Sequence, residues 1–246
     1  MDIILALKEE LKVEKWQVEA AVKLIDEGNT IPFISRYRKE VTGSLNDEQL
    51  RNLFERLTYL RNLEEKKEQV LKSIEEQGLL TDELKKKIVE AQTMVLVEDL
   101  YRPYRPKRKT RASVAKEKGL QPLADFILEQ NATEDLNIEA AKYISEEKEV
   151  KTAADALSGA KDIIAEAISD NADYRKYIRE TTVDEGSVSS VAKDEKVQSV
   201  YEMYYNFEEP VKKLAGHRTL ALNRGEAEKI LTVKVNAPVD RILTFL

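Results

Sequence analysis

The architecture of the chain can be worked out from residues 46–78, which read NDEQLRNLFERLTYLRNLEEKKEQVLKSIEEQG. Asn46 with Gln49 three positions later is a capping-box start. Apolar residues then recur at near-heptad spacing: Leu50, Leu53, Leu57, Leu60, Leu63, Val70 and Ile74. This pattern predicts a single helix of about 30 residues, on the order of 45 Å long. Residues 64–69, EEKKEQ, interrupt the apolar stripe, and we expect them to project into solvent.

A pair of short helices is expected before this long helix. Residues 15–27 place Trp16, Ala20, Ala21, Leu24 and Ile25 on one stripe, and Gly28 suits the position just past a helix end. Pro32 then suits the first turn of a second helix. The hairpin predicts a helix-turn-helix-like N-terminal unit.

The second helix of this pair is expected to have an apolar side and a basic side. Its buried face would hold Phe33, Ile34, Tyr37 and Val41. The outward face would then carry Arg36, Arg38 and Lys39. In a DNA-binding helix-turn-helix the second helix enters the major groove, so these three residues are a candidate nucleic-acid patch. The alternative is an ordinary helical hairpin whose three basic residues are surface residues with no binding role.

The C-terminal part of the chain predicts one more long helix and a single strand. A helical pattern runs from Thr152 to about Val183, with a pause at Asp170–Asn171, and residues 184–195 have the composition of a mobile loop. Residues 230–235, ILTVKV, alternate like a strand. We therefore predict an all-α, elongated multi-helix scaffold with one short C-terminal strand. The expected domains are residues 1–60, 61–228 and 229–246.

A basic island lies within an acidic chain. Residues 101–112 read YRPYRPKRKTRA, and residues 101–118 hold eight Lys and Arg against one Glu, a net charge of +7. The whole chain carries −6, so the rest carries −13. Two prolines stiffen the island toward an extended loop. Such an island invites a polyanion at a defined place.

The island supplies the main candidate nucleic-acid contacts. Its cations would bind phosphates, and its tyrosines would support the loop or stack on bases. These candidates are Tyr101, Tyr104, Arg105, Lys107, Arg108, Lys109 and Arg111. The alternative is a solvated basic turn whose charges pair with the acidic body of the same chain.

Other functional classes find little support in the sequence. The chain has no Cys, and His217, its one His, has no readable catalytic partner. No phosphate-binding, dinucleotide-binding or nucleophile-elbow motif occurs. We therefore expect no enzyme activity, no metal and no cofactor. The apolar run near Met1 is too short for a signal peptide or membrane span, so we expect a cytoplasmic protein without a membrane partner.

Three stretches resemble the Tex family of bacterial transcription accessory proteins. They are residues 29–78, which begin NTIPFISRYRKEVTG; residues 97–125, VEDLYRPYRPKRKTRASVAKEKGLQPLAD; and residues 209–235, EPVKKLAGHRTLALNRGEAEKILTVKV. The resemblance covers nearly the whole chain. It implies a helical, cytoplasmic, nucleic-acid-binding protein, and this chain would be the N-terminal half.

The resemblance also implies what would follow in a longer protein. Family members continue into an RNase H-like domain, a helix-hairpin-helix region and a C-terminal OB-fold RNA-binding domain that is chiefly responsible for the nucleic-acid affinity. The predicted strand near residue 230 would then begin a truncated RNase H-like domain. The resemblance implies the N-terminal scaffold of a transcription accessory protein, and the charge pattern predicts that this scaffold contacts RNA or DNA through the basic island. The alternative is a scaffold that docks proteins of the transcription machinery without touching nucleic acid.

Overall fold

The computed structural model describes residues 2–106, 109–130 and 135–246. The chain divides into two compact units, with the boundary between Arg105 and Pro106. The described residues are mostly helical, as predicted, but they also include a sheet of three strands, so the all-α class is only approximately right. The expected domain boundaries stay predictions.

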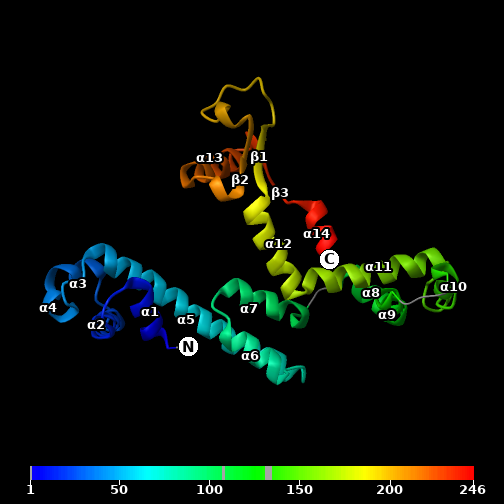
Figure 1. The fold of residues 1–246 in the computed structure, drawn as a ribbon, viewed down its shortest axis with the longest axis horizontal. Helices are drawn as coiled ribbons and strands as arrows, with labels where there is room; N and C mark the ends of the chain where they lie inside the picture. Colours follow the sequence, from blue (N-terminus) through cyan, green and yellow to red (C-terminus); the bar gives the residue numbers. More distant parts are fainter. Residues whose placement is uncertain (1, 107–108, 131–134) are drawn as a thin grey trace. The chain divides into compact units, whose positions relative to one another are not determined.

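The first unit is entirely helical (Figure 1). Its elements are α1 (Ile3–Leu11), α2 (Lys15–Asp26), α3 (Ile31–Tyr37), α4 (Lys39–Thr42), α5 (Asp47–Glu76), α6 (Asp82–Glu90), α7 (Met94–Tyr101) and the 3₁₀ turn η1 (Arg102–Tyr104).

Helix α5 is the element around which this unit packs. It begins where predicted, because the Asn46 side chain accepts from the Gln49 N–H at 2.8 Å and the Gln49 side chain accepts from the Asn46 N–H at 3.0 Å. All seven apolar residues of the predicted stripe are buried. Helices α1, α2 and α3 pack along one half of α5, and α6 and α7 pack along the other (Figure 1).

Two ion pairs fasten the first helices to α5. Arg56 pairs with Glu10 of α1. Arg61 donates to both carboxylate oxygens of Asp26 on α2, at 2.7 and 2.8 Å. The hydrogen bond from Arg61 lowers the pKa of the Asp26 carboxyl below its ordinary value. Both pairs lie on the surface, so the leucine stripe remains the main source of stability.

Residues 64–69, which interrupt the apolar stripe, do not all project into solvent. Lys67 is only 4% exposed and fills the position between Leu63 and Val70. Its Nζ donates to Glu64 Oε1 at 2.8 Å and to the Val89 carbonyl at 2.9 Å. The aliphatic stem therefore continues the stripe, while the ammonium ties α5 to the last turn of α6.

We expect Lys67→Ala to lower the free energy of unfolding by about 2 kcal/mol, because it leaves a cavity and removes the bond to Val89. Lys67→Met keeps the volume of the side chain and should cost clearly less. Urea denaturation of both variants measures the difference. Equal stability of Lys67→Ala and the parent chain would contradict the packing role.

The α2–α3 hairpin is present, but its details differ from the prediction. The chain turns at Gly28 (φ +83°) between α2 and α3. On α2 the buried residues are Val18, Ala21 and Leu24, whereas Trp16 is 52% exposed. The predicted second helix breaks at Arg38 (φ −131°, ψ 25°) into α3 and α4.

This break changes which side chains are buried. Ile34 is buried as expected, whereas Tyr37 is 56% exposed and Val41 43% exposed, so both were predicted wrongly. A helix-turn-helix of the DNA-reading kind is not confirmed, since α3 has only seven residues before the break.

The second unit combines helices with the sheet. Its helices are α8 (Arg111–Glu117), α9 (Gln121–Glu129), α10 (Leu136–Ala141), α11 (Ala153–Asp170), α12 (Ala172–Glu185), α13 (Gly216–Ala227) and α14 (Val239–Phe245). Its strands are β1 (Ser187–Ala192), β2 (Asn206–Pro210) and β3 (Leu231–Asn236), and its 3₁₀ turns are η2 (Glu202–Tyr204) and η3 (Val211–Lys213).

The predicted second long helix is two helices. The pause expected at Asp170–Asn171 is confirmed: Asn171 ends α11, and its side chain accepts from the N–H groups of Asp173 and Tyr174 to start α12. At its other end α11 packs closely on α8, where Gly159 of α11 faces Ala115 of α8.

We expect Gly159→Ala to destabilise the chain by about 1–3 kcal/mol. A Cβ at this position would overlap the Leu120 side chain and lie 3.2 Å from the Ala115 Cβ. Gly216→Ala is the matched control, because Gly216 lies in the first turn of α13 with open space around it. It should leave stability unchanged or raise it slightly. Thermal unfolding measures the stability of the two variants. If Gly159→Ala unfolds at the same temperature as the parent chain, the close packing of α11 on α8 is refuted.

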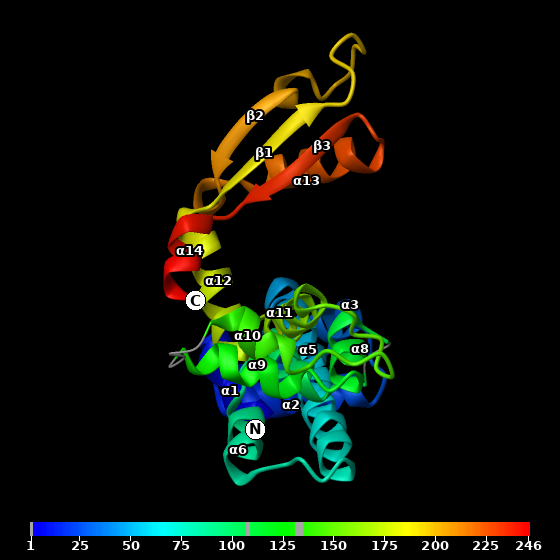
Figure 2. The same ribbon diagram turned by 90° about the vertical axis from the view of Figure 1, so that its right-hand side faces the viewer.

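The predicted mobile loop and lone strand belong to one antiparallel sheet, ordered β2-β1-β3 (Figure 2). Residues 187–192 of the expected loop form the central strand, and Val188 lies opposite Glu209 of β2 and Val235 of β3. Helix α13 covers one face, where the core contains Val188, Tyr201 and Leu231. The prediction of a single strand is therefore wrong.

Candidate nucleic-acid interface

In the first unit, the basic island begins at the end of α7. The Tyr101 hydroxyl lies 2.9 Å from Ser73 Oγ, and the Tyr104 carbonyl accepts from Gln77 Nε2 at 3.0 Å. Both rings are half-buried against the core of this unit. The two tyrosines therefore hold the chain against α5 and offer only part of their rings. Arg105 is exposed and forms no ion pair with any described residue.

Two predicted site residues, Lys107 and Arg108, lie outside the described residues.

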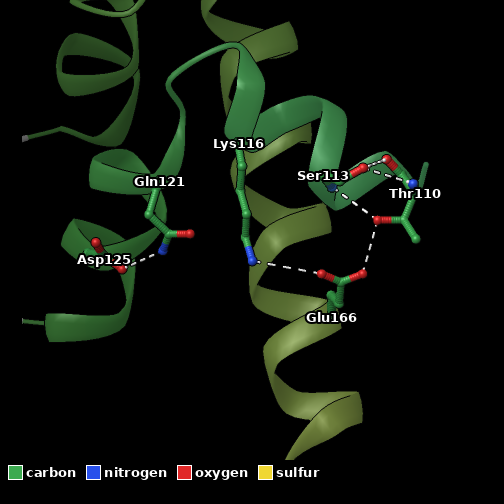
Figure 3. Close-up of polar contacts among 6 residues, drawn as sticks. All are labelled: Thr110, Ser113, Lys116, Gln121, Asp125 and Glu166. Atoms are coloured by element: carbon green, nitrogen blue, oxygen red, sulfur yellow. Dashed lines mark hydrogen bonds and ion pairs between the residues drawn. The ribbon is translucent and has the colours of Figure 1, made fainter. Parts of the chain in front are cut away.

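In the second unit, the island leads into α8 through a capping box (Figure 3). The Ser113 N–H donates to Thr110 Oγ1 at 3.0 Å, and the Thr110 N–H donates to Ser113 Oγ at 2.9 Å. Thr110 Oγ1 in turn donates to Glu166 Oε1 of α11 at 3.0 Å, and Lys116 Nζ lies 3.8 Å from the other oxygen of that carboxylate. Glu166 thus fixes the start of α8 to α11.

The described cations of this part of the island all have carboxylates nearby. The closest pairs are Lys109–Glu117 at 3.7 Å, Arg111–Asp162 at 3.5 Å, Lys116–Glu166 at 3.8 Å and Lys118–Glu149 at 3.9 Å. For Lys109 and Arg111 these pairs agree with the alternative stated above, in which the basic charges pair with carboxylates of the same chain. The contacts are long, and the Arg111 side chain is 87% exposed, so each pair contributes little stability and can be exchanged.

A pocket of about 380 Å³ lies beside these residues, between α8, the turn at Glu149–Val150 and α11. Ala115, Val114 and Leu120 contribute apolar surface to it. Three cations and three carboxylates also line it: Lys109, Arg111, Lys118, Glu149, Asp155 and Asp162. The pocket therefore presents no excess of positive charge.

The remaining predicted cations lie where α3 meets α4, in the first unit. We call Phe33, Arg36, Tyr37, Arg38 and Lys39 the α3–α4 corner. Arg36 and Lys39 are exposed, and none of its three cations forms an ion pair with a described residue. The Arg38 guanidinium lies 5.0 Å from the centre of the Phe33 ring, and its Nη1 donates to the Tyr37 carbonyl at 3.1 Å.

Sequence reasoning missed the aromatic part of this corner. Tyr37 was expected in the core, yet its ring lies largely in solvent, 5.4 Å from the Phe33 ring and tilted by 46°. The alternation Arg36, Tyr37, Arg38 is the signal that could have found it, since cations flanking an aromatic residue are typical of nucleic-acid surfaces. The corner therefore combines a ring face with positive charge that has no acidic partner.

Other kinds of site are not apparent in the described ranges. Among residues 2–106, 109–130 and 135–246, no three acidic or His side chains gather as a metal site would require. The helices of these ranges include none with the length and apolar character that crossing a bilayer requires.

The fold and its displayed charges define a helical scaffold that also carries a small sheet. Family models match the chain in two places: the Tex-like protein N-terminal domain matches residues 1–75, and the Tex central region-like model matches residues 131–242. The chain belongs to the Tex family.

Three relatives illustrate the range of similarity. The chain is 49% identical to the uncharacterized protein YdcI of Bacillus subtilis and 42% identical to the transcriptional accessory protein Tex of Neisseria gonorrhoeae, and each match covers 98% of the chain. It is 30% identical, over 96% of its length, to the human S1 RNA-binding domain-containing protein 1. The matches span 34%, 32% and 24% of these relatives, so the chain corresponds to about a third of the bacterial proteins.

Proposed function

We propose that this chain is the helical scaffold of a nucleic-acid-binding transcription accessory protein, and that its principal phosphate contacts come from the α3–α4 corner. One observation carries the proposal: Arg36, Arg38 and Lys39 have no carboxylate within ion-pair distance among the described residues. A phosphate can approach them without displacing a carboxylate, so the gain from counterion release is not offset by the loss of an ion pair. The names of the bacterial and human relatives support a role with nucleic acid.

The basic island has a secondary role in this proposal. A phosphate at Lys109 or Arg111 must compete with Glu117 or Asp162, which weakens each contact. Arg105 has no such competitor, and Lys107 and Arg108 add charge to the same segment of sequence. The proposal assigns the chain no catalytic step, and its setting is the cytoplasm, where bacterial transcription takes place.

A protein-docking scaffold is the second candidate, and the connection between β1 and β2 favours it. Val200 is 85% exposed and Met203 74% exposed there. The connection is nevertheless held in place, since the Tyr201 hydroxyl donates to Glu228 Oε1 at 2.9 Å and the Tyr205 hydroxyl lies 2.9 Å from Ser199 Oγ. Apolar side chains displayed on a fixed loop suit contact with a protein partner.

The salt dependence of RNA binding tests the proposal. We expect the combined variant Arg36→Gln, Arg38→Gln, Lys39→Gln to bind RNA with a weaker salt dependence. The slope of the logarithm of the association constant against the logarithm of the salt concentration should become shallower by about 2, because each lost phosphate contact with a single strand removes about 0.7 from the slope. The matched control neutralises three paired cations, Lys109→Gln, Arg111→Gln and Lys116→Gln. It should change the slope by less than about 1.

Fluorescence anisotropy with a short single-stranded RNA provides the measurement, and circular dichroism verifies that both variants fold. A larger effect of the control variant would move the principal contact to the basic island. An absence of RNA binding by the parent chain, even at low salt, would favour the protein-docking candidate.

A further inference from the structure

We propose that Tyr37 is a base-stacking residue, and that the α3–α4 corner accepts one unpaired base of a single-stranded nucleic acid. This inference rests on the proposed function and adds to it a contact with the base itself. It starts from the exposure of the ring. The chain has ten tyrosines, all of them described, and nine are buried or half-buried, whereas Tyr37 is 56% exposed.

The geometry of the break explains why this ring is available. Helix α3 ends at Tyr37, and Arg38 leaves the helical conformation, so no further turn of α3 covers the ring. The Tyr37 hydroxyl forms no hydrogen bond with a described residue, and the ring contacts Phe33 on the preceding turn. The exposed ring of Tyr37 therefore contributes neither to the packing of the core nor to a hydrogen-bond network among the described residues. An exposed aromatic ring with no structural partner at its free face is a suitable platform for a planar base.

The ring is also held in position before any ligand arrives. Phe33 supports it at a centroid distance of 5.4 Å, and Phe33 is itself contacted by the Arg38 guanidinium at 5.0 Å. Arg38 is anchored by its hydrogen bond to the Tyr37 carbonyl. A platform that is already ordered loses less conformational entropy when a base stacks on it.

The surrounding charge selects the rest of the ligand. Arg36 and Lys39 are exposed and unpaired within the described residues, so phosphates on either side of the stacked base can reach a cation. In a duplex both faces of each base are covered by its neighbours, and the ring of Tyr37 would find no free face. With seven residues in α3 and four in α4, neither helix is long enough to lie along a major groove as a reading helix does.

The test compares the affinity of the full chain for three ligands: a short single-stranded RNA, the same strand with its bases removed, and the corresponding duplex. The strands have equal length and equal charge. We expect the single-stranded RNA to bind most tightly. Tyr37→Ala should weaken its binding at least about fivefold and leave the abasic strand unaffected. Tyr37→Phe keeps the ring and should stay within about twofold of the parent chain.

Two further variants make the result specific. Tyr37→Leu keeps apolar bulk but has no aromatic face, so it should lose as much as Tyr37→Ala. Phe54→Ala removes another exposed aromatic residue of the same unit, 45% exposed on α5, and should have no effect.

The outcomes separate the two proposals. Equal affinity for the normal and abasic strands would overturn base stacking and leave the phosphate contact standing. Tighter binding of the duplex, or normal RNA binding by Tyr37→Leu, would also overturn stacking. If neither the normal nor the abasic strand binds, the proposed function fails and the stacking proposal fails with it.

Discussion

Burial of the apolar stripe on α5 is the constraint on which the first unit depends. The stripe runs the length of a 30-residue helix and contacts α1, α2 and α3 on one half and α6 and α7 on the other. Lys67 keeps the stripe continuous through its most polar turn, because its stem packs while its ammonium binds the Val89 carbonyl. As a result, α3 is held against a rigid helix, and the α3–α4 corner is presented by a fixed support.

The pairing of charges, more than their number, distinguishes the two basic regions of the chain. The island at residues 101–118 holds more cations, but those of its second half lie against Glu117, Asp162, Glu166 and Glu149. The corner holds only three, and these have no acidic partner among the described residues. A phosphate approaching the corner therefore meets three cations that no carboxylate of a described residue holds in an ion pair. For this reason we propose that the main contact lies at the corner.

Local sequence signals were sufficient to predict those features that depend on residues a few positions apart, such as the starts of helices. The start of α5 follows from Asn46 and Gln49, and the division between α11 and α12 follows from Asn171. Tyr37 was wrongly predicted to be buried, because a prediction from helical periodicity assumes an unbroken helix. No Gly or Pro at Arg38 signals the break in the sequence. The sequence of strand β1, SVSSVA, predicts a loop because its serines lie on both faces of the strand. Ser190 bonds the Tyr204 carbonyl on the inside, and Asn236 bonds Ser189 on the outside.

The partners of the basic island could not be predicted for a related reason, since Asp162 is about fifty residues from Arg111 in the sequence and only the packing of α11 on α8 joins them.

The proposed contact at the α3–α4 corner can be located by ultraviolet cross-linking of the full chain to a uridine-rich single-stranded RNA, followed by mass spectrometry of the linked peptides. We expect the linked peptide to span residues 31–42, with Tyr37 as the modified residue. Cross-links confined to residues 101–118, or spread over both units without a site at the corner, would contradict the proposed contact of the corner with nucleic acid.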